Sequence, residues 1–313
     1  MRAIAGGREG GTAGVRVVLW CGGVAERVTM AERTNRVYLR ELTRAAGGAV
    51  LFSFPLLMTM EMWDLGAEIG RGRLAAFLLV GLWLLYGLSR RVGFARNASR
   101  LDDGLDALSA FAVGVLVSAA LLALFGVLHG GSVVREVAGA LALQAIPAGI
   151  GAILARKQFH AGGAVDDEDD EAEDEGGDDS DGAASYGREL FLMFGGAVFV
   201  AFNVAPTDEV ALIAQLMTPW HAVALVVGSI ALLHVLVYRV ELAGQEEWPE
   251  GAGFAAVFVR YSLAGYAVAV LVSLYILWTF GRTDGIAPSE VAMMVAVLGF
   301  PAALGAATAR LVV

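Results

Sequence analysis

The chain has 313 residues, of which 57% are hydrophobic and only 17% charged, and its mean hydropathy is +0.65. This composition excludes a soluble globular domain and predicts an all-α polytopic membrane protein, whose first partner is the lipid bilayer. The formal charge of −10 arises largely from one acidic run between Asp166 and Asp181. The rest of the chain is near neutral, so it offers no basic surface for a nucleic acid.

The N-terminal stretch before the first apolar segment is rich in glycine and arginine. Residues 1–40 are predicted to form a cytoplasmic arm, and residues 1–29 are interpreted as an upstream start artefact with Met30 as the natural start, or else as part of that arm. The apolar patch from Val15 to Cys21 is interrupted by Arg16, which does not fit a signal peptide. Because Cys21 is the one cysteine, an intramolecular disulfide and a thiolate metal cluster are excluded.

Eight apolar segments follow, each close to the roughly 20 residues that a helix needs to cross about 30 Å of hydrocarbon. They lie near residues 45–65, 74–90, 107–128, 135–155, 188–206, 219–239, 255–280 and 290–312. The sequence therefore predicts eight transmembrane helices.

The second half of the chain repeats the first. Residues 40–61 align with residues 188–209 through matched Arg-Glu-Leu, Gly-Gly-Ala-Val and Thr-x-Glu elements, and further matches follow in the same order. We assign residues 41–157 and 188–313 to two four-helix repeats. Because four spans return the chain to the side from which it entered, the repeats are predicted to be parallel, with any shared cavity between them.

Arginines flanking the spans predict the orientation. Most of them, such as Arg90, Arg96 and Arg156, fall on the side that also holds both termini. The excess of positive charge on that side predicts a multi-pass protein of the inner (cytoplasmic) membrane with both termini in the cytoplasm. The acidic linker, residues 158–187, is then expected to be a disordered cytoplasmic segment that repels itself.

The first helix of each repeat contains a helix breaker. Pro55 lies near the middle of the first span and predicts a kink or break around residues 51–55. In the second repeat Asn203 takes the place of Pro55, and Pro206 follows three residues later. A break at membrane depth frees backbone carbonyls that need an ion, water or neighbouring helices. The alternative is a plain proline kink packed against other helices.

A Thr-x-Glu element follows the breaker in both repeats, at the predicted outer ends of the spans. Carboxylates at this depth normally face a partner or a water-filled cavity. Two of them near the axis between the repeats could bind a cation together or share a proton. The predicted ion or proton site comprises Glu61, Glu209, Asp208, Thr59, Thr207 and Asn203. The alternative is that the acids simply lie at the outer interface.

Catalytic signatures are missing from the sequence. It contains no His-Glu-x-x-His, no Gly-x-Ser-x-Gly, no P-loop and no dinucleotide fingerprint, so we expect neither an enzyme nor a cofactor. The preferred function is binding or transport of a small cation or proton through a polar cavity between spans one and five. The alternative is a scaffold or sensor whose acidic linker recruits a cytoplasmic protein.

Two segments resemble a known family. They are Gly-Gly-Ala-Val-Leu-Phe-Ser-Phe-Pro-Leu-Leu-Met-Thr-Met-Glu-Met-Trp, ending at Trp63, and Phe-Asn-Val-Ala-Pro-Thr-Asp-Glu, ending at Glu209. The chain is similar, over about residues 33–313, to a prokaryotic family of integral membrane proteins of unknown function. This resemblance implies a multi-pass membrane protein and no particular chemistry.

Overall fold

The structure is a computed structural model that describes residues 39–40, 42–92, 100–128, 133–161, 182–238, 255 and 258–312. The chain divides into two compact units, Met1–Arg44 and Ala45–Val313. In the first unit the described residues are helical, and the Thr43 hydroxyl donates to the Leu39 carbonyl at 2.8 Å. The remainder of the predicted arm and the acidic run lie outside the described residues. All that follows concerns the second unit.

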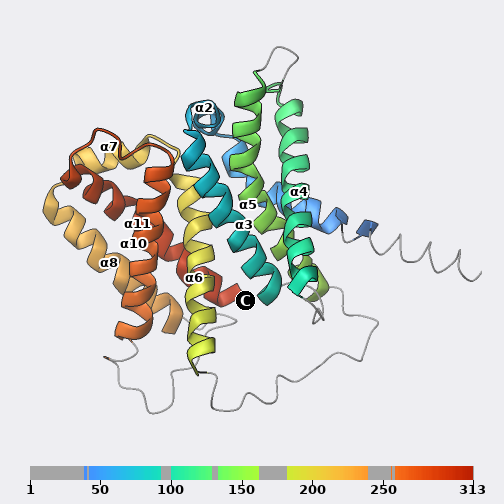
Figure 1. Cartoon of the computed structure of the whole chain (residues 1–313). Helices are drawn as coiled ribbons and strands as arrows, with labels where there is room; N and C mark the ends of the chain where they lie inside the picture. Colours follow the sequence, from blue (N-terminus) through green and yellow to red (C-terminus); the bar gives the residue numbers. More distant parts are fainter. Residues whose placement is uncertain are drawn as a thin grey trace, which may run out of the picture. The chain divides into compact units, whose positions relative to one another are not determined.

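The second unit is built from helices, and its described residues contain no strand (Figure 1). The first helix, Leu42–Leu57, belongs to this unit from Ala45 onward. After it come α2 (Met60–Glu68), α3 (Arg71–Val92), α4 (Arg100–Leu124), α5 (Val134–Ala161), α6 (Gly182–Val204), α7 (Glu209–Leu216), α8 (Pro219–Tyr238), the π-helix η1 (Phe258–Leu263), α10 (Ala264–Thr279) and α11 (Pro288–Val312). The predicted all-α fold class is therefore confirmed. The described ends of the predicted linker belong to α5 and α6.

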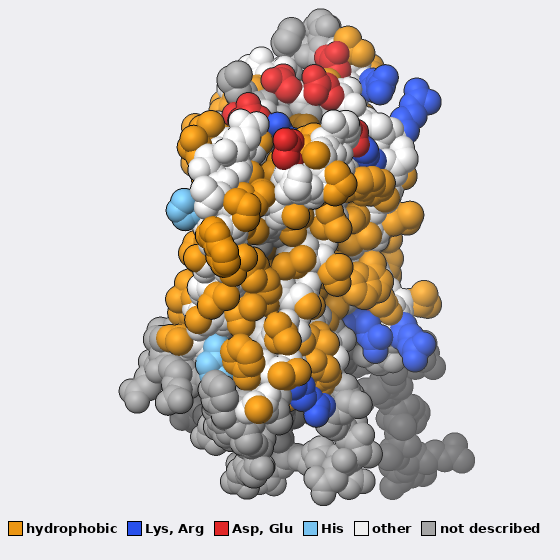
Figure 2. Space-filling view, turned by 90° about the vertical axis from the view of Figure 1, so that its left-hand side faces the viewer, with side chains coloured by type: hydrophobic (Ala, Val, Ile, Leu, Met, Phe, Trp, Pro, Cys, Tyr) orange, Lys and Arg blue, Asp and Glu red, His pale blue; other side chains and the backbone are white. Residues whose placement is uncertain are grey.

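Seven of the described helices are long and apolar enough to cross a membrane. The count reaches eight if the first helix and α2 are taken as one broken span. Figure 2 shows one face of the molecule with apolar side chains over its middle and Asp and Glu side chains gathered at one end. This distribution is typical of a protein whose middle lies in hydrocarbon, in agreement with the prediction of a polytopic membrane protein.

The helices pack in two groups that follow the repeats. In the first repeat α2, α3 and α4 all pack on α5, and in the second α6, α7, α8 and α10 all pack on α11. The central helix α5 is the most enclosed of the seven spans, with 72% of its apolar window buried. Helices α5 and α11 each continue through an internal proline, Pro147 and Pro301.

Backbone contacts between the first and last helix of each repeat are equivalent. A Cβ atom on Gly48 would overlap the Gly151 carbonyl and the Ala155 side chain of α5. A Cβ atom on Gly196 would overlap the Gly305 carbonyl and the Ala309 side chain of α11. The two pairs occupy matching sequence positions, so the repeat seen in the sequence is also a repeat of packing.

The third helix of each repeat ends in the same turn. Gly126 and Gly281 have φ angles of 77° and 73°, which residues with a side chain rarely adopt. The amide of the next residue donates back to the helix in both cases, from Val127 to the Leu122 carbonyl at 3.0 Å and from Arg282 to the Leu277 carbonyl at 2.9 Å. Both glycines follow a phenylalanine, Phe125 and Phe280, so this Phe-Gly pair marks a helix stop shared by the repeats.

Aromatic side chains hold the two repeats together. Phe52 of the first helix contacts Phe199 of α6, with ring centroids 4.9 Å apart, and Phe77 of α3 stacks on Phe202 of α6 at the same distance. Trp83 of α3 contacts Phe191 of α6 edge-on at 5.3 Å. We call these contacts the aromatic seam. Offset and edge-on pairs of this kind add to the energy of simple burial.

Candidate functional site

The first helix breaks at Met58 and Thr59 rather than at the predicted position. It continues through Pro55 to Leu57, and the next helix, α2, is bent from it by 87°. Thr59 has extended backbone angles, φ −100° and ψ 121°. The break expected around residues 51–55 therefore lies a few residues later, at Met58 and Thr59. Pro55 removes one backbone hydrogen bond without ending the helix, whereas the extended backbone of Thr59 ends it.

Neighbouring side chains satisfy two of the carbonyls that this break frees. The Thr59 hydroxyl donates to the Leu56 carbonyl at 3.0 Å, and the indole Nε1 of Trp63 donates to the Leu57 carbonyl at 3.2 Å. Backbone acceptors left without a partner in hydrocarbon cost several kcal/mol each. The carbonyls of Leu56 and Leu57 thus both have protein partners.

Helix α2 carries its acids on a different face from the one that packs on α5. Its buried face carries Met62, Gly66 and Ile69, and Gly66 lies so close to α5 that a Cβ atom would overlap the backbone of Ala140. Three carboxylates lie on a different face of the helix: Glu61, which is half-buried, and Asp64 and Glu68, which are exposed. Among the described residues no Lys or Arg lies in ion-pair range of these three carboxylates.

The second repeat has its break at Ala205 to Asp208, where the sequence placed Pro206. The Thr207 hydroxyl donates to the Val204 carbonyl, three residues earlier, at 2.9 Å. The Thr59 hydroxyl makes the equivalent bond to the Leu56 carbonyl in the first repeat. Arg282 then contributes two bonds, from Nη2 to the Pro206 carbonyl at 2.5 Å and from Nη1 to Asp208 at 2.7 Å. An arginine side chain therefore binds both the freed carbonyl and the acid beside it.

Helix α7 begins with Glu209, whose carboxyl group has a lowered pKa. The hydrogen bond from the Thr207 hydroxyl lowers the pKa most, followed by a bond from the Glu209 backbone amide. The same hydroxyl also reaches the Val204 carbonyl, and its single proton serves one acceptor at a time. Unlike α2, α7 exposes apolar side chains, including Leu212 and Leu216.

Asn203, the neutral candidate ligand, lies in the last turn of α6. Its amide nitrogen donates to the Phe199 carbonyl at 2.7 Å. Its Oδ1 atom is buried and has no hydrogen-bond partner among the described residues. This oxygen is the one buried acceptor of the predicted site that remains available to a ligand.

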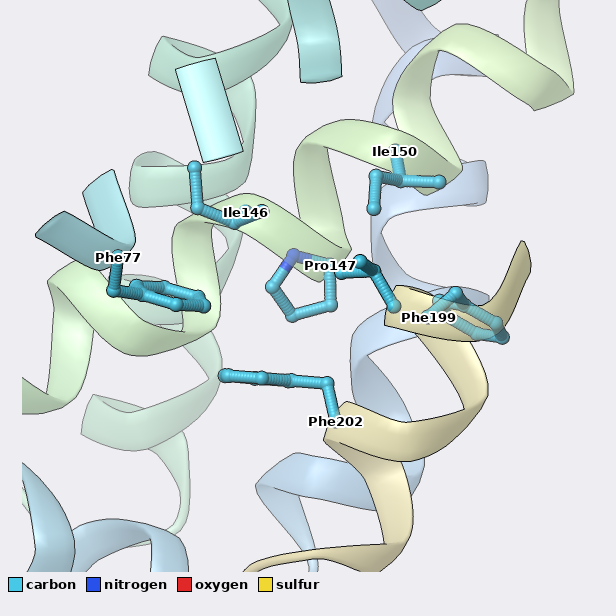
Figure 3. A pocket seen from close by; sticks show the side chains of 7 residues that line it. Phe77, Ile146, Pro147, Ile150, Phe199 and Phe202 are labelled. Atoms are coloured by element: carbon cyan, nitrogen blue, oxygen red, sulfur yellow. The ribbon is translucent and has the colours of Figure 1, made fainter. Parts of the chain in front are cut away.

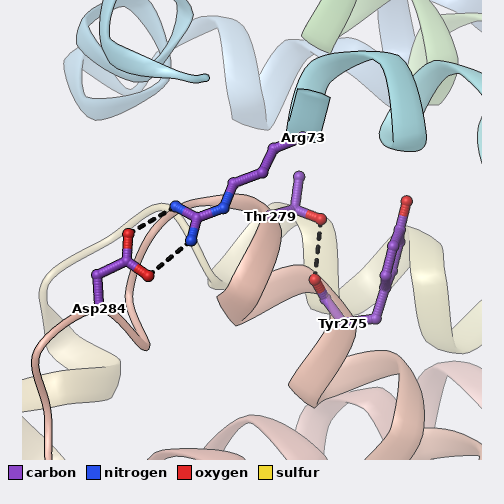
Figure 4. A network of polar contacts seen from close by, with 4 residues as sticks. All are labelled: Arg73, Tyr275, Thr279 and Asp284. Atoms are coloured by element: carbon purple, nitrogen blue, oxygen red, sulfur yellow. Dashed lines mark hydrogen bonds and ion pairs between the residues drawn. The ribbon is translucent and has the colours of Figure 1, made fainter. Parts of the chain in front are cut away.

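An ion pair connects the two repeats near these breaks. Arg73 of α3 binds Asp284 with two hydrogen bonds of 2.7 and 2.6 Å, as Figure 4 shows. The arginine side chain also lies over the Trp278 ring, 5.3 Å from its centroid. The hydrogen bond from Arg73 is the main cause of a lowered pKa of Asp284. Arg73 thus joins the start of α3 to the turn after α10.

The space between the repeats next to the aromatic seam is apolar (Figure 3). It has no room for a water molecule. Its lining residues are Phe77, Ile146, Pro147, Ile150, Val198, Phe199 and Phe202. The predicted site residues lie elsewhere, Glu61 on α2 against α5 and Glu209 on α7 against α11. Among the described residues no group of three His, Cys, Asp or Glu side chains could hold a metal ion.

A comparison with protein families matches residues 41–313 to the family described as "Putative integral membrane protein (DUF2391)". The chain belongs to this family. The family resemblance expected from the two sequence segments is therefore confirmed, and the chain is an integral membrane protein of the multi-pass class. No curated protein and no solved structure matches the chain.

Sequence reasoning about this DUF2391 protein missed two residues of the breaks, Arg282 and Trp63. Arg282 follows Gly281 in the turn after α10, and its repeat equivalent is Val127, so the alignment of the repeats gave no signal for it. Trp63 lies outside the predicted ion or proton site. Its position six residues after Leu57 could have suggested a hydrogen bond only if the break had been placed at Thr59.

Proposed function

We propose that the protein binds a small cation or a proton at the α2 end of its first repeat, with Glu61 as the ionisable ligand. The observation that carries this proposal is the set of acids on α2, Glu61, Asp64 and Glu68, with no base in ion-pair range among the described residues. A surface of one sign attracts counter-ions. Because Glu61 is half-buried, its charge is less screened than that of its exposed neighbours.

The second repeat supports the same proposal because it already contains a positive charge at the equivalent place. There the Arg282 guanidinium lies between the Pro206 carbonyl and the Asp208 carboxylate, where it supplies the positive charge itself. The positions equivalent to Arg282 and Asp208 in the first repeat are Val127 and Met60. A cation from solution would therefore bind at the first repeat. Glu209 would instead stabilise the start of α7 as an acid in the first turn of a helix.

Transport of the ion across the membrane would require a second conformation. The apolar space lined by Phe77, Phe199 and Phe202 offers no oxygen ligands and no room for water, which supports a state closed to ions. The repeats would have to move apart along the aromatic seam to open a path, in the manner of transporters built from repeats. In this proposal Asn203, with its unpaired buried Oδ1, would provide a ligand on such a path.

The test is cation and proton flux in proteoliposomes. Glu61→Gln keeps the shape of the side chain and removes its charge, and Glu209→Gln is the matched control at the equivalent position. We expect wild type and Glu209→Gln to show the flux and Glu61→Gln to lose it. Equal flux in wild type and Glu61→Gln would contradict the assignment.

The scaffold alternative is distinguished by deleting residues 165–185, which lie in the predicted acidic linker. A cation-binding protein should keep its flux after this deletion. If the intact protein shows no flux, and a cytoplasmic protein captured by the intact chain is lost on deletion, the acidic segment is the functional part instead.

A further inference from the structure

A second pocket, of about 260 Å³, lies between α3 and α6, toward the end of α3 remote from the Arg73 ion pair. Its lining residues are Trp83, Tyr86, Gly87 and Arg90 of α3 and Phe191 of α6. The four α3 residues follow one another at the spacing of a single helix face. The pocket therefore presents one helix face of the first repeat to a phenylalanine of the second.

Arg90 provides the charge of this pocket. Its Nε atom lies 3.6 Å from Asp103 of α4, and its guanidinium lies 6.0 Å from the centroid of the Tyr86 ring. Neither Nη nitrogen has a hydrogen bond to any of the described residues. A guanidinium with both Nη nitrogens available is suited to binding two oxygens of a phosphate group at once.

The position of Arg90 along its helix fixes the depth of the pocket. The apolar span of α3 runs from Arg71 to Arg90, so Arg90 marks one of its two boundaries with water. Lipid headgroups lie at this boundary. Trp83, two turns deeper, is 56% exposed and contacts Phe191 and Phe194 edge-on at 5.3 and 5.7 Å. The pocket thus has a cationic end at headgroup depth and an aromatic wall toward the hydrocarbon.

An interfacial aromatic belt with an arginine that reaches toward water would account for these residue types but not for the cavity. The cavity depends on Gly87, where a Cβ atom would overlap the Phe191 ring. The second repeat does not reproduce it, because the positions equivalent to Trp83, Gly87 and Arg90 are Ala231, Val235 and Tyr238. The α3 side of the pocket therefore has no counterpart on α8, its repeat equivalent.

We propose that this pocket binds the phosphate group of an anionic phospholipid, with Arg90 pairing with the phosphate oxygens and an acyl chain passing over Trp83. The volume suits a headgroup rather than a whole lipid, since pockets for drug-sized ligands start at about 300 Å³. Because α3 and α6 belong to different repeats, the bound lipid bridges them. Basic pockets between transmembrane helices are known to take anionic headgroups.

The test is thermal unfolding of the purified protein in detergent with added phosphatidylglycerol, phosphatidylcholine or inorganic phosphate. Phosphatidylglycerol should raise the Tm of wild type and of the control Arg71→Gln, at the other end of α3, and leave Arg90→Gln unchanged. An equal rise in Arg90→Gln would overturn the proposal. So would a rise in wild type with inorganic phosphate at the same concentration, which would indicate a free anion rather than a lipid.

A second measurement does not depend on the fold of the Arg90 variant. Phosphatidylglycerol brominated on its acyl chains should quench the tryptophan fluorescence of wild type in a saturable manner. The Trp83→Phe variant should lose that saturable part. Unchanged saturable quenching in Trp83→Phe would place the lipid elsewhere and contradict the proposed site.

Discussion

Gly48 packs directly against the carbonyl group of Gly151, so the first helix and α5 meet backbone to backbone. Gly196 meets Gly305 in the same way in the second repeat. In a bilayer, apolar side chains gain little by leaving lipid, and close approach of backbones supplies much of the attraction between helices. The two glycine contacts are therefore equivalent supports of the two repeats.

Substitution by alanine should cost more stability at the second glycine of each Gly-Gly pair than at the first. Gly48→Ala and Gly196→Ala force their helices apart and should each destabilise the protein by about 1–3 kcal/mol. Gly47→Ala is the matched control, because no atom lies within 4 Å of the Cβ position there. Thermal unfolding in detergent measures the difference. A loss at Gly47 as large as that at Gly48 would show that backbone contact is not the cause.

The aromatic seam should depend on Phe202, which is 1% exposed and contacts Phe77 and Phe280. Phe202→Ala removes a buried ring between the repeats and should lower stability by about 3–5 kcal/mol. Phe54→Ala is the control, because Phe54 is 47% exposed and its loss opens no cavity. Unfolding by denaturant in mixed micelles measures both, and similar losses would argue against the seam.

The ion pair of Arg73 and Asp284 should stabilise the protein in a pH-dependent way. Because the pKa of Asp284 is lowered in the folded state, the contribution is full above the unfolded value of about 3.9 and is lost as the pH falls through the folded value. The Tm of Asp284→Asn should therefore lie below that of wild type at pH 7, with the gap closing in acid. A gap that stays constant down to pH 2 would contradict this account.

Arg282 should hold the turn between α6 and α7 closed. Arg282→Gln removes the bonds to the Pro206 carbonyl and to Asp208, so the backbone amides of residue 205 and residues 207–209 should exchange with solvent at least several-fold faster. Arg135→Gln, at an exposed arginine near the start of α5, is the control. Hydrogen exchange measured by mass spectrometry tests this prediction. Unchanged protection of these amides in Arg282→Gln would show that Arg282 does not stabilise this turn.

Much of the fold follows from local sequence. Runs of about 20 apolar residues predict membrane spans because hydrocarbon demands satisfied backbone groups over a fixed thickness. The Gly-Gly-Ala-Val element marks the repeat in the sequence, and in the structure the second glycine of each pair makes the close helix contact. His234 of α8 lies with its Nδ1 atom 2.7 Å from the Ser262 hydroxyl.

The finer geometry depends on contacts between distant segments. The apolar pattern did not separate the start of α2 from the first predicted span, residues 45–65, and it left α7, Glu209–Leu216, outside the predicted spans. The Arg282 bond to Pro206 and the Arg73 bond to Asp284 join residues far apart in the chain. The shared site of Glu61 and Glu209 stays a prediction. Its expected oxygen ligands Thr59 and Thr207 are already engaged with the carbonyls of their own helices.

Infrared difference spectroscopy of the reconstituted protein during cation exchange tests the proposed role of Glu61 most directly. If Glu61 binds the ion, carboxylate bands should shift when the cation is added to wild type. The same bands should persist in Glu209→Gln and disappear in Glu61→Gln. Carboxylate bands that remain in Glu61→Gln, or that are absent from wild type, would contradict a cation site at the α2 end of the first repeat.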